Sequence, residues 1–426
     1  MNLIDRVRED LALDANIRKL YLYRFLMNFQ LWWPIWVVYL LRDRGLSLTQ
    51  ITLLDTPFFL LIVLSEVPTG AIADRFGRRV SLMLGSGLFA VAVFVFGLAD
   101  SYVVILISYT AWGLGQTFQS GADAAILYDS LKLAGREDEF QKVNSRLWAL
   151  TSFAVLLAIL IGAPIAAWTS LSLPILLSAG IAMMAVPVAF TLHEPKVGAG
   201  EHEDYLQMVR EGVGQVWRRP VLRYIVVYSG VLMASTFTPL IFMQPYLQHH
   251  GVGTGALGLW QAPVRAVGIV SALAAYQFVS RAGQRQAFFA LPVTLGVSAV
   301  LLAGVDRMFM YPAFLGIGFV AGIQNPVLAT YINHRIPSER RATILSVQSV
   351  IGNFIFAGSQ PFGGFIADEW GLRTLFLVFG VITIVVGTGV LILWSRAEAD
   401  ETAGSGGDVR ADALPEPLRE PVAASS

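Results

Sequence analysis

Cysteine is missing from this sequence of 426 residues. The chain therefore has no disulfide framework, no thiolate nucleophile and no cysteine metal ligand. Its five histidines do not form an H-E-x-x-H pattern, and no G-x-x-x-x-G-K-[ST] phosphate loop is present. The sequence thus predicts no metal site, no cofactor and no ATP-hydrolysing site, and without a catalytic cluster we do not expect an enzyme.

Charged residues are also scarce. They make up 14% of the chain, against about 25% in an ordinary soluble domain. Hydrophobic residues make up 55%, and the mean hydropathy is +0.61. So much apolar surface cannot be hidden in one soluble core, so the lipid bilayer must surround most of the chain. The formal net charge is zero, which gives no reason to expect a nucleic-acid partner.

The apolar residues fall into twelve runs, each long enough to cross a bilayer as a helix of about 20 residues. We expect the spans near residues 18–41, 48–69, 79–99, 102–131, 142–168, 171–192, 221–248, 255–280, 286–304, 308–333, 339–367 and 372–395. The first run is too long for the core of a signal peptide and has no cleavage site, so it reads as an uncleaved span.

The positive charges predict the orientation. With twelve spans, 24 of the 30 Lys and Arg lie on the side that holds both termini. Only Arg42, Arg44, Arg307 and Arg373 fall on the other side. Because cytoplasmic loops carry an excess of Lys and Arg, we expect both termini to be cytoplasmic. The expected location is the inner membrane of a bacterium.

The longest internal loop divides the spans into two sets of six, as in carriers built from two pseudo-symmetric bundles. The predicted fold class is an all-α membrane protein with twelve transmembrane helices in two six-helix bundles. The expected segments are a cytoplasmic N-terminal segment (1–17), a first bundle (18–193), a cytoplasmic linker (194–220), a second bundle (221–395) and a disordered cytoplasmic tail (396–426).

A motif stands between spans two and three: Gly70-Ala-Ile-Ala-Asp74-Arg75-Phe-Gly77-Arg78-Arg79. Its simplest explanation is a tight cytoplasmic turn whose arginines set the topology. Its spacing closely resembles the signature loop of the major facilitator superfamily, G-x-[LI]-A-D-R-x-G-R-[KR].

The resemblance covers residues 18 to 395 and implies a secondary transporter that works by alternating access. In that family the loop connects the cytoplasmic ends of spans two, three and eleven in the outward-facing state. Asp74 would then lie near Ser338 to Arg341. The sequence departs from the family pattern in three places: Ser280 replaces the acid of the second-half loop, Tyr109 stands where many members have an arginine, and the exporter motif of span five is reduced to Gly162-Ala-Pro164.

Few ionisable residues lie inside spans, where charge is costly and usually faces the protein interior. They are Arg24, Asp55, Glu66, Asp123 and Arg265. At a rise of about 1.5 Å per residue, Arg24, Glu66 and Asp123 have similar depths. They form either a structural ion network or a protonation site in which Asp123 or Glu66 carries the proton.

Arg265 lies halfway along span eight, and no acid of the second bundle has a similar depth. Its guanidinium can bind an anionic substrate, pair across the cavity with Asp55 or Asp123, or bind backbone carbonyls. Other polar and aromatic residues in the central spans are candidates for lining a cavity or for joining helices. They are Asn28, Gln30, Trp33, Gln116, Gln119, Gln244, Gln324 and Asn325.

The leading functional prediction is a monomeric secondary transporter that exports a drug-like solute or metabolite with proton coupling. The alternative is an importer or exchanger of a small organic anion bound by Arg265. A third possibility, from another class, is a membrane sensor or scaffold that has a carrier fold and does not transport. The expected partners are a small-molecule substrate, a proton or other ion, and the bilayer.

Overall fold

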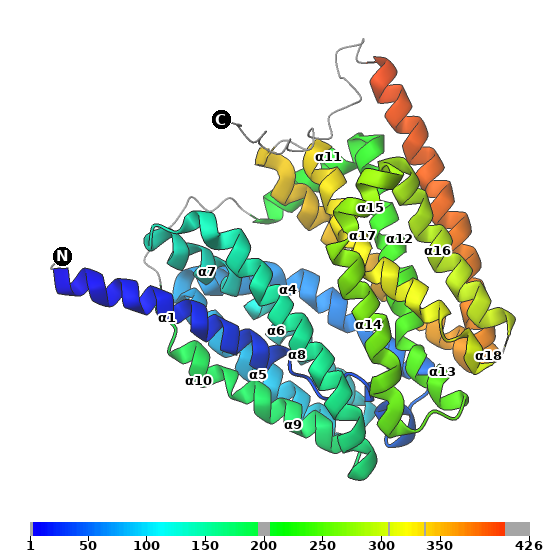
Figure 1. Cartoon of the computed structure of the whole chain (residues 1–426), viewed down its shortest axis with the longest axis horizontal. Coiled ribbons are helices and arrows are strands. Elements are labelled where there is room, and N and C mark those ends of the chain that lie inside the picture. The colour runs from blue at the N-terminus through cyan, green and yellow to red at the C-terminus, as the bar shows by residue number, and fades with distance from the viewer. Residues whose placement is uncertain (1–2, 195–204, 306, 336–337, 405–426) are drawn as a thin grey trace, which may run out of the picture.

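The computed structural model describes residues 3–194, 205–305, 307–335 and 338–404. Within these ranges the chain forms helices and no strands. We call residues 3–194 the first half and residues 220–404 the second half; helix α11 lies between them in the sequence (Figure 1). Helices suit an apolar chain because each satisfies its own backbone hydrogen bonds in lipid.

The first half contains ten α-helices and one short 3-10 helix. They are α1 (Leu3–Asn28), α2 (Trp36–Arg42), α3 (Leu48–Leu53), α4 (Asp55–Phe76), α5 (Arg78–Leu98), α6 (Tyr102–Gln119), α7 (Ala122–Leu133), η1 (Glu137–Glu139), α8 (Phe140–Trp168), α9 (Ser172–Met183) and α10 (Ala185–Phe190).

The linker helix and the second half follow the same pattern of long helices and short connections. Their elements are α11 (Tyr205–Arg218), α12 (Pro220–Ile241), α13 (Met243–His249), η2 (Thr254–Ala256), α14 (Leu257–Leu273), α15 (Ala275–Ala282), α16 (Gln284–Gly304), η3 (Met308–Met310), α17 (Ala313–Arg335) and α18 (Ser338–Gly404).

The predicted fold class is confirmed. Among the described residues, nine helical segments are long and apolar enough to cross a membrane, and the one that spans Thr343–Glu401 covers most of predicted span eleven and all of span twelve. The other two predicted spans, the first and the fourth, are each divided by non-helical residues, at 29–35 and at 120–121.

Helix α18 changes direction at Gly371, whose φ of 82° lies in the left-handed region that glycine adopts without steric cost. This turn separates spans eleven and twelve where the sequence predicts a break. The helix then continues to Gly404, so residues 396–404, which we expected to be disordered, are helical. The rest of the predicted tail lies outside the described residues.

The surface of the molecule is apolar over the spans, as a lipid-facing surface must be. Large hydrophobic side chains such as Leu64, Ile107 and Val385 are more than 60% exposed. Inside, buried aromatic and aliphatic side chains form the core, with Tyr23, Phe89 and Trp394 among the largest.

The two ends of the molecule differ in how the halves meet. We call the end that carries α11 the linker face, and the end that carries α3 and α13 the opposite face. In Figure 1 the halves lie together near α13, and they separate towards α11. Contacts of α8 with α14, and of α3 and α4 with α18, join the halves.

Candidate functional site

Arg265 extends from α14 in the second half towards the first half. Its guanidinium carbon lies 5.7 Å from the centre of the Trp33 ring, within the range of a cation–π contact. The side chain is exposed. Its exposure and its contact with Trp33 of the other half fit a side chain that faces an open space between the halves. Among the described residues, no carboxylate pairs with it.

Trp33 belongs to the non-helical segment 29–35 between α1 and α2. Pro34 favours this break, because it lacks a backbone N–H and disfavours helix at the residue before it. Two glutamines of the second half bind the exposed carbonyls: Gln244 Nε2 donates to Trp33 O, and Gln261 Nε2 donates to Pro34 O, both at 2.9 Å. The position of the Trp33 ring therefore depends on both halves.

An aromatic cluster continues from Trp33 into the first half. The rings of Trp33 and Trp32 stack with their centres 4.7 Å apart, and Trp32 meets Trp112 edge-on at 4.7 Å. Tyr109 and Phe58 extend the cluster, each within 6 Å of Trp112. Arg265 thus lies at the end of a wall of large, flat and mostly buried rings.

Asp55, the first residue of α4, is buried beside this cluster with 4% of its surface exposed. Its Oδ1 accepts a hydrogen bond of 2.8 Å from Tyr109 Oη. No described Lys, Arg or His forms a salt bridge with it. The donor beside the acid is therefore a neutral hydroxyl.

The predicted contact between Arg24 and Asp123 is present. Arg24 of α1 forms an ion pair with Asp123 of α7, and its guanidinium also lies 5.7 Å from the centre of the Trp148 ring. The side chains are 23% and 10% exposed. Glu66, the third member of the expected network, is partly buried on α4. The arrangement connects spans one, four and five of the first half.

The signature loop is held within the first half. The backbone N–H groups of Arg78 and Arg79 donate to the two carboxylate oxygens of Glu194, each at 2.8 Å. The Arg78 side chain forms an ion pair with Asp129 at the end of α7. Glu194 comes just after span six, and its position in the sequence gave no indication that it would bind the signature loop.

The other residues of the loop lie on either side of this contact. Gly70, Asp74 and Arg75 are exposed on α4, and Gly77 starts α5. The side chains at Ser338 to Arg341, where we expected Asp74 to lie in the outward-facing state, fall outside the described side chains.

The candidate cavity residues divide into two groups. Asn28, Gln30 and Gln119 donate to backbone carbonyls three or four residues earlier, so they complete their own helical segments. Gln244 and Gln324 are 3% exposed and bond across helices, which is the second of the two roles expected for them. Gln116 and Asn325 are exposed. Gln116 and Asn325 are therefore the most exposed of these candidates, and Trp33 is partly buried.

The opposite face is closed by hydrogen bonds between the halves. Asp368 of α18 accepts from Leu48 N at 3.0 Å, from Thr49 N at 2.7 Å and from Thr49 Oγ1 at 2.6 Å. These groups begin α3, so a carboxylate of the second half caps a helix of the first. Gly364 permits the approach: a Cβ there would lie 2.1 Å from Thr52 Oγ1.

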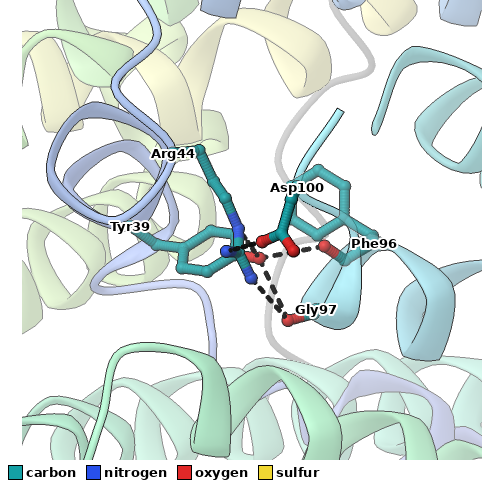
Figure 2. Close-up of polar contacts among 5 residues, drawn as sticks. All are labelled: Tyr39, Arg44, Phe96, Gly97 and Asp100. Carbon is teal, nitrogen blue, oxygen red and sulfur yellow. Dashed lines mark hydrogen bonds and ion pairs between the residues drawn. The ribbon is translucent and has the colours of Figure 1, made fainter. Parts of the chain in front are cut away.

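A second carboxylate at this face acts within the first half alone. Asp100 forms an ion pair with Arg44, which also donates to Tyr39 Oη at 2.8 Å and to Gly97 O at 3.2 Å (Figure 2). Tyr39 Oη in turn donates to Phe96 O at 3.0 Å. This cluster fixes the end of span one to the end of span three.

The described hydrogen bonds between the halves all involve residues 33–56 of the first half. One of them, from Thr56 Oγ1 to Ala357 O, measures 2.9 Å. The opposite face is therefore closed in this structure. No group of three His, Asp or Glu in the described ranges could hold a metal ion.

Comparison with known proteins gives one family. The model of the Major Facilitator Superfamily matches residues 24–359 and 293–424. An uncharacterized transporter of this type from Bacillus subtilis, YxaM, is 22% identical over 83% of this chain and 89% of its own. A probable 4-methylmuconolactone transporter of Cupriavidus pinatubonensis is 23% identical over 90% of each chain.

Solved structures share the fold. The crystal structure of a mutant of the nucleoside transporter NupG matches with a TM-score of 0.79 at 12% identity, covering 89% of this chain and 99% of that one. A bacterial homologue of the lysosomal transporter Spinster, in an inward-facing and unoccupied conformation, gives 0.72 at 16% identity, covering 94% and 99%. The chain therefore belongs to the major facilitator superfamily and is a secondary transporter.

Proposed function

We propose that this transporter carries a small organic anion by alternating access, with Arg265 as the anion ligand. The observation that supports this is the Arg265 guanidinium, which faces the space between the halves without a described carboxylate partner. A cation inside a membrane protein needs a counter-charge, and a substrate carboxylate can supply it. The wall formed by Trp33 and Trp32 favours an anion that carries a flat apolar group.

We further propose that the linker face is cytoplasmic and that the protein resides in a bacterial inner membrane. The excess of Lys and Arg at this end supports the orientation. The contacts at the opposite face then correspond to an inward-facing state, which agrees with the fold match to a Spinster homologue in that conformation.

Proton coupling is part of the same proposal, and Asp55 is its candidate carrier. The acid is buried and receives a hydrogen bond from a neutral hydroxyl, whereas Asp123 is already paired with Arg24. Export of a drug-like cation is the competing function, because Asp55 could also attract a cation.

The substrate proposal can be tested by thermal unfolding of the purified protein in detergent. Benzoate and its neutral analogue benzamide form a matched pair of probes. A ligand that binds only the folded state at 100 times its dissociation constant adds about 2.7 kcal/mol to its stability. We expect benzoate, and not benzamide, to raise the melting temperature of wild type. The effect should be lost in Arg265→Ala.

Arg373→Ala is the control, since Arg373 lies at the opposite face and donates to Ala303 O at 3.0 Å. It should retain the benzoate effect. Equal stabilisation by both probes, no stabilisation by benzoate, or a full benzoate effect in Arg265→Ala would contradict the anion proposal. Stabilisation by tetraphenylphosphonium that Asp55→Asn removes would favour cation export instead.

A further inference from the structure

A pocket of about 400 Å³ opens at the linker end of the second half, between α15 and α17. The helix of span eight bends at Ala274, where α14 ends and α15 begins. Just before the bend α14 contacts α17 closely, with Ser271 Oγ donating to Phe319 O at 2.9 Å. Beyond the bend the two helices part, and the pocket lies in the space between them.

The inside of this pocket is apolar. Phe278 and Phe319 meet edge-on with ring centres 5.8 Å apart, and Ile323 and two alanines complete the walls. The polar lining residues are Gln277 and Arg281, and both are exposed. The pocket therefore combines an apolar interior with one cationic side chain at its edge.

Arg281 differs from its counterpart in the first half. The loop after span two has Asp74, and its Arg78 is paired with Asp129. The loop after span eight has Ser280 in the place of the acid. In the described part of the chain Arg281 forms no ion pair or hydrogen bond. Its charge is available to a ligand.

The surface beside the pocket exposes apolar side chains. Val270, Leu273 and Tyr276 lie on the same bent helix and are 64%, 82% and 68% exposed. An amphiphile that enters from the bilayer can keep an acyl chain against these residues and the apolar walls, while its phosphate reaches Arg281. Basic pockets between transmembrane helices on the cytoplasmic side bind anionic headgroups in this way.

We propose that this pocket binds an anionic phospholipid of the inner leaflet, with its phosphate at Arg281 and part of an acyl chain between Phe278 and Phe319. The proposal uses the orientation given above and does not depend on the transported substrate. Failure of the benzoate test would leave it unaffected.

The experiment measures thermal unfolding of delipidated protein in detergent with added phosphatidylglycerol, phosphatidylcholine or inorganic phosphate. Phosphatidylglycerol should stabilise wild type at a concentration at least fivefold lower than phosphatidylcholine, since one basic residue near the surface contributes about 1 kcal/mol. Arg281→Gln should remove this difference. Arg285→Gln, a matched change in the same loop at a residue outside the pocket lining, should preserve it.

Ala282→Trp tests the apolar part of the site, because it fills the pocket and leaves the cation in place. It should weaken phosphatidylglycerol binding, and Arg281→Gln covers the case in which this variant fails to fold. Equal effects of the two lipids, or a preserved preference in Arg281→Gln, would overturn the proposal. Inorganic phosphate that protects as well as phosphatidylglycerol would show that the site takes a free anion instead of a lipid.

Discussion

Asp368 allows a direct test of how the opposite face is kept closed. In Asp368→Asn the side chain keeps one oxygen acceptor, and its amide nitrogen then faces N–H and O–H groups of Leu48 and Thr49. Hydrogen bonds to a charged acceptor contribute about 1.5–3 kcal/mol each, and less when exposed as here. We therefore expect closure of this face to lose about 1–2 kcal/mol, which is a five- to thirtyfold change in the population ratio.

The absence of native cysteine makes the readout simple, because one introduced cysteine is a unique thiol. Ala357 is 2% exposed, and its carbonyl accepts from Thr56 across the halves. A cysteine at 357 should react slowly with a maleimide in the closed state. In the Asp368→Asn background its labelling rate should rise five- to thirtyfold.

Asp100→Asn is the matched control, since it makes the same chemical change at the same face. Its carboxylate pairs with Arg44 inside the first half, as Figure 2 shows. Labelling at 357 should therefore stay near the wild-type rate in this variant. An unchanged rate in Asp368→Asn, or equal increases in the two variants, would refute the assignment of Asp368 to closure.

Two further predictions concern the first half and the contact between the halves. Asp123→Asn leaves Arg24 without its partner and should lower the free energy of unfolding by about 3 kcal/mol. Exchanging the two residues should recover most of the melting temperature. No recovery would mean that the ion pair between them does not stabilise the fold. Gly364→Ala, whose methyl group would lie 2.1 Å from Thr52 Oγ1, should speed labelling at 357 with little change in melting temperature. Gly162→Ala should instead lower the melting temperature, because its Cβ would lie 1.8 Å from a backbone oxygen within the same half and such crowding costs about 3 kcal/mol. A lower melting temperature in Gly364→Ala with faster labelling in Gly162→Ala would contradict the assignment of the first glycine to the contact between the halves and of the second to the fold of one half.

Span positions and the Arg24–Asp123 contact could be predicted because both depend on local regularity. Apolar runs and loop charges locate helices in lipid, and a constant rise per residue gives side chains their depth. Arg24 and Asp123 have similar depths on neighbouring spans, so pairing was the expected outcome, and the structure has it.

The contacts between the halves could not be predicted in this way. Gln244 was expected either to line a cavity or to join helices, but its partner could not be foreseen: the break at residues 29–35 exposes a carbonyl at Trp33 that its amide binds. Nothing in the local sequence shows that residues more than 200 positions apart will meet. Asp368 and Thr49 present the same difficulty, since their pairing depends on how the two bundles pack.

Two helix starts in the first half are completed by side chains of the second. Gln244 Oε1 accepts from Val37 N at 3.1 Å at the start of α2, and Asp368 does the same for α3. A helix start without its cap loses about 1 kcal/mol and frays. Ser47 and Gln50 still cap α3 from within the first half, whereas the N-cap residue of α2 offers no side-chain cap. When the opposite face opens, the first turn of α2 should therefore loosen and exchange its amide hydrogens faster than that of α3. Local unfolding of this turn then becomes part of the free-energy difference between the two transport states.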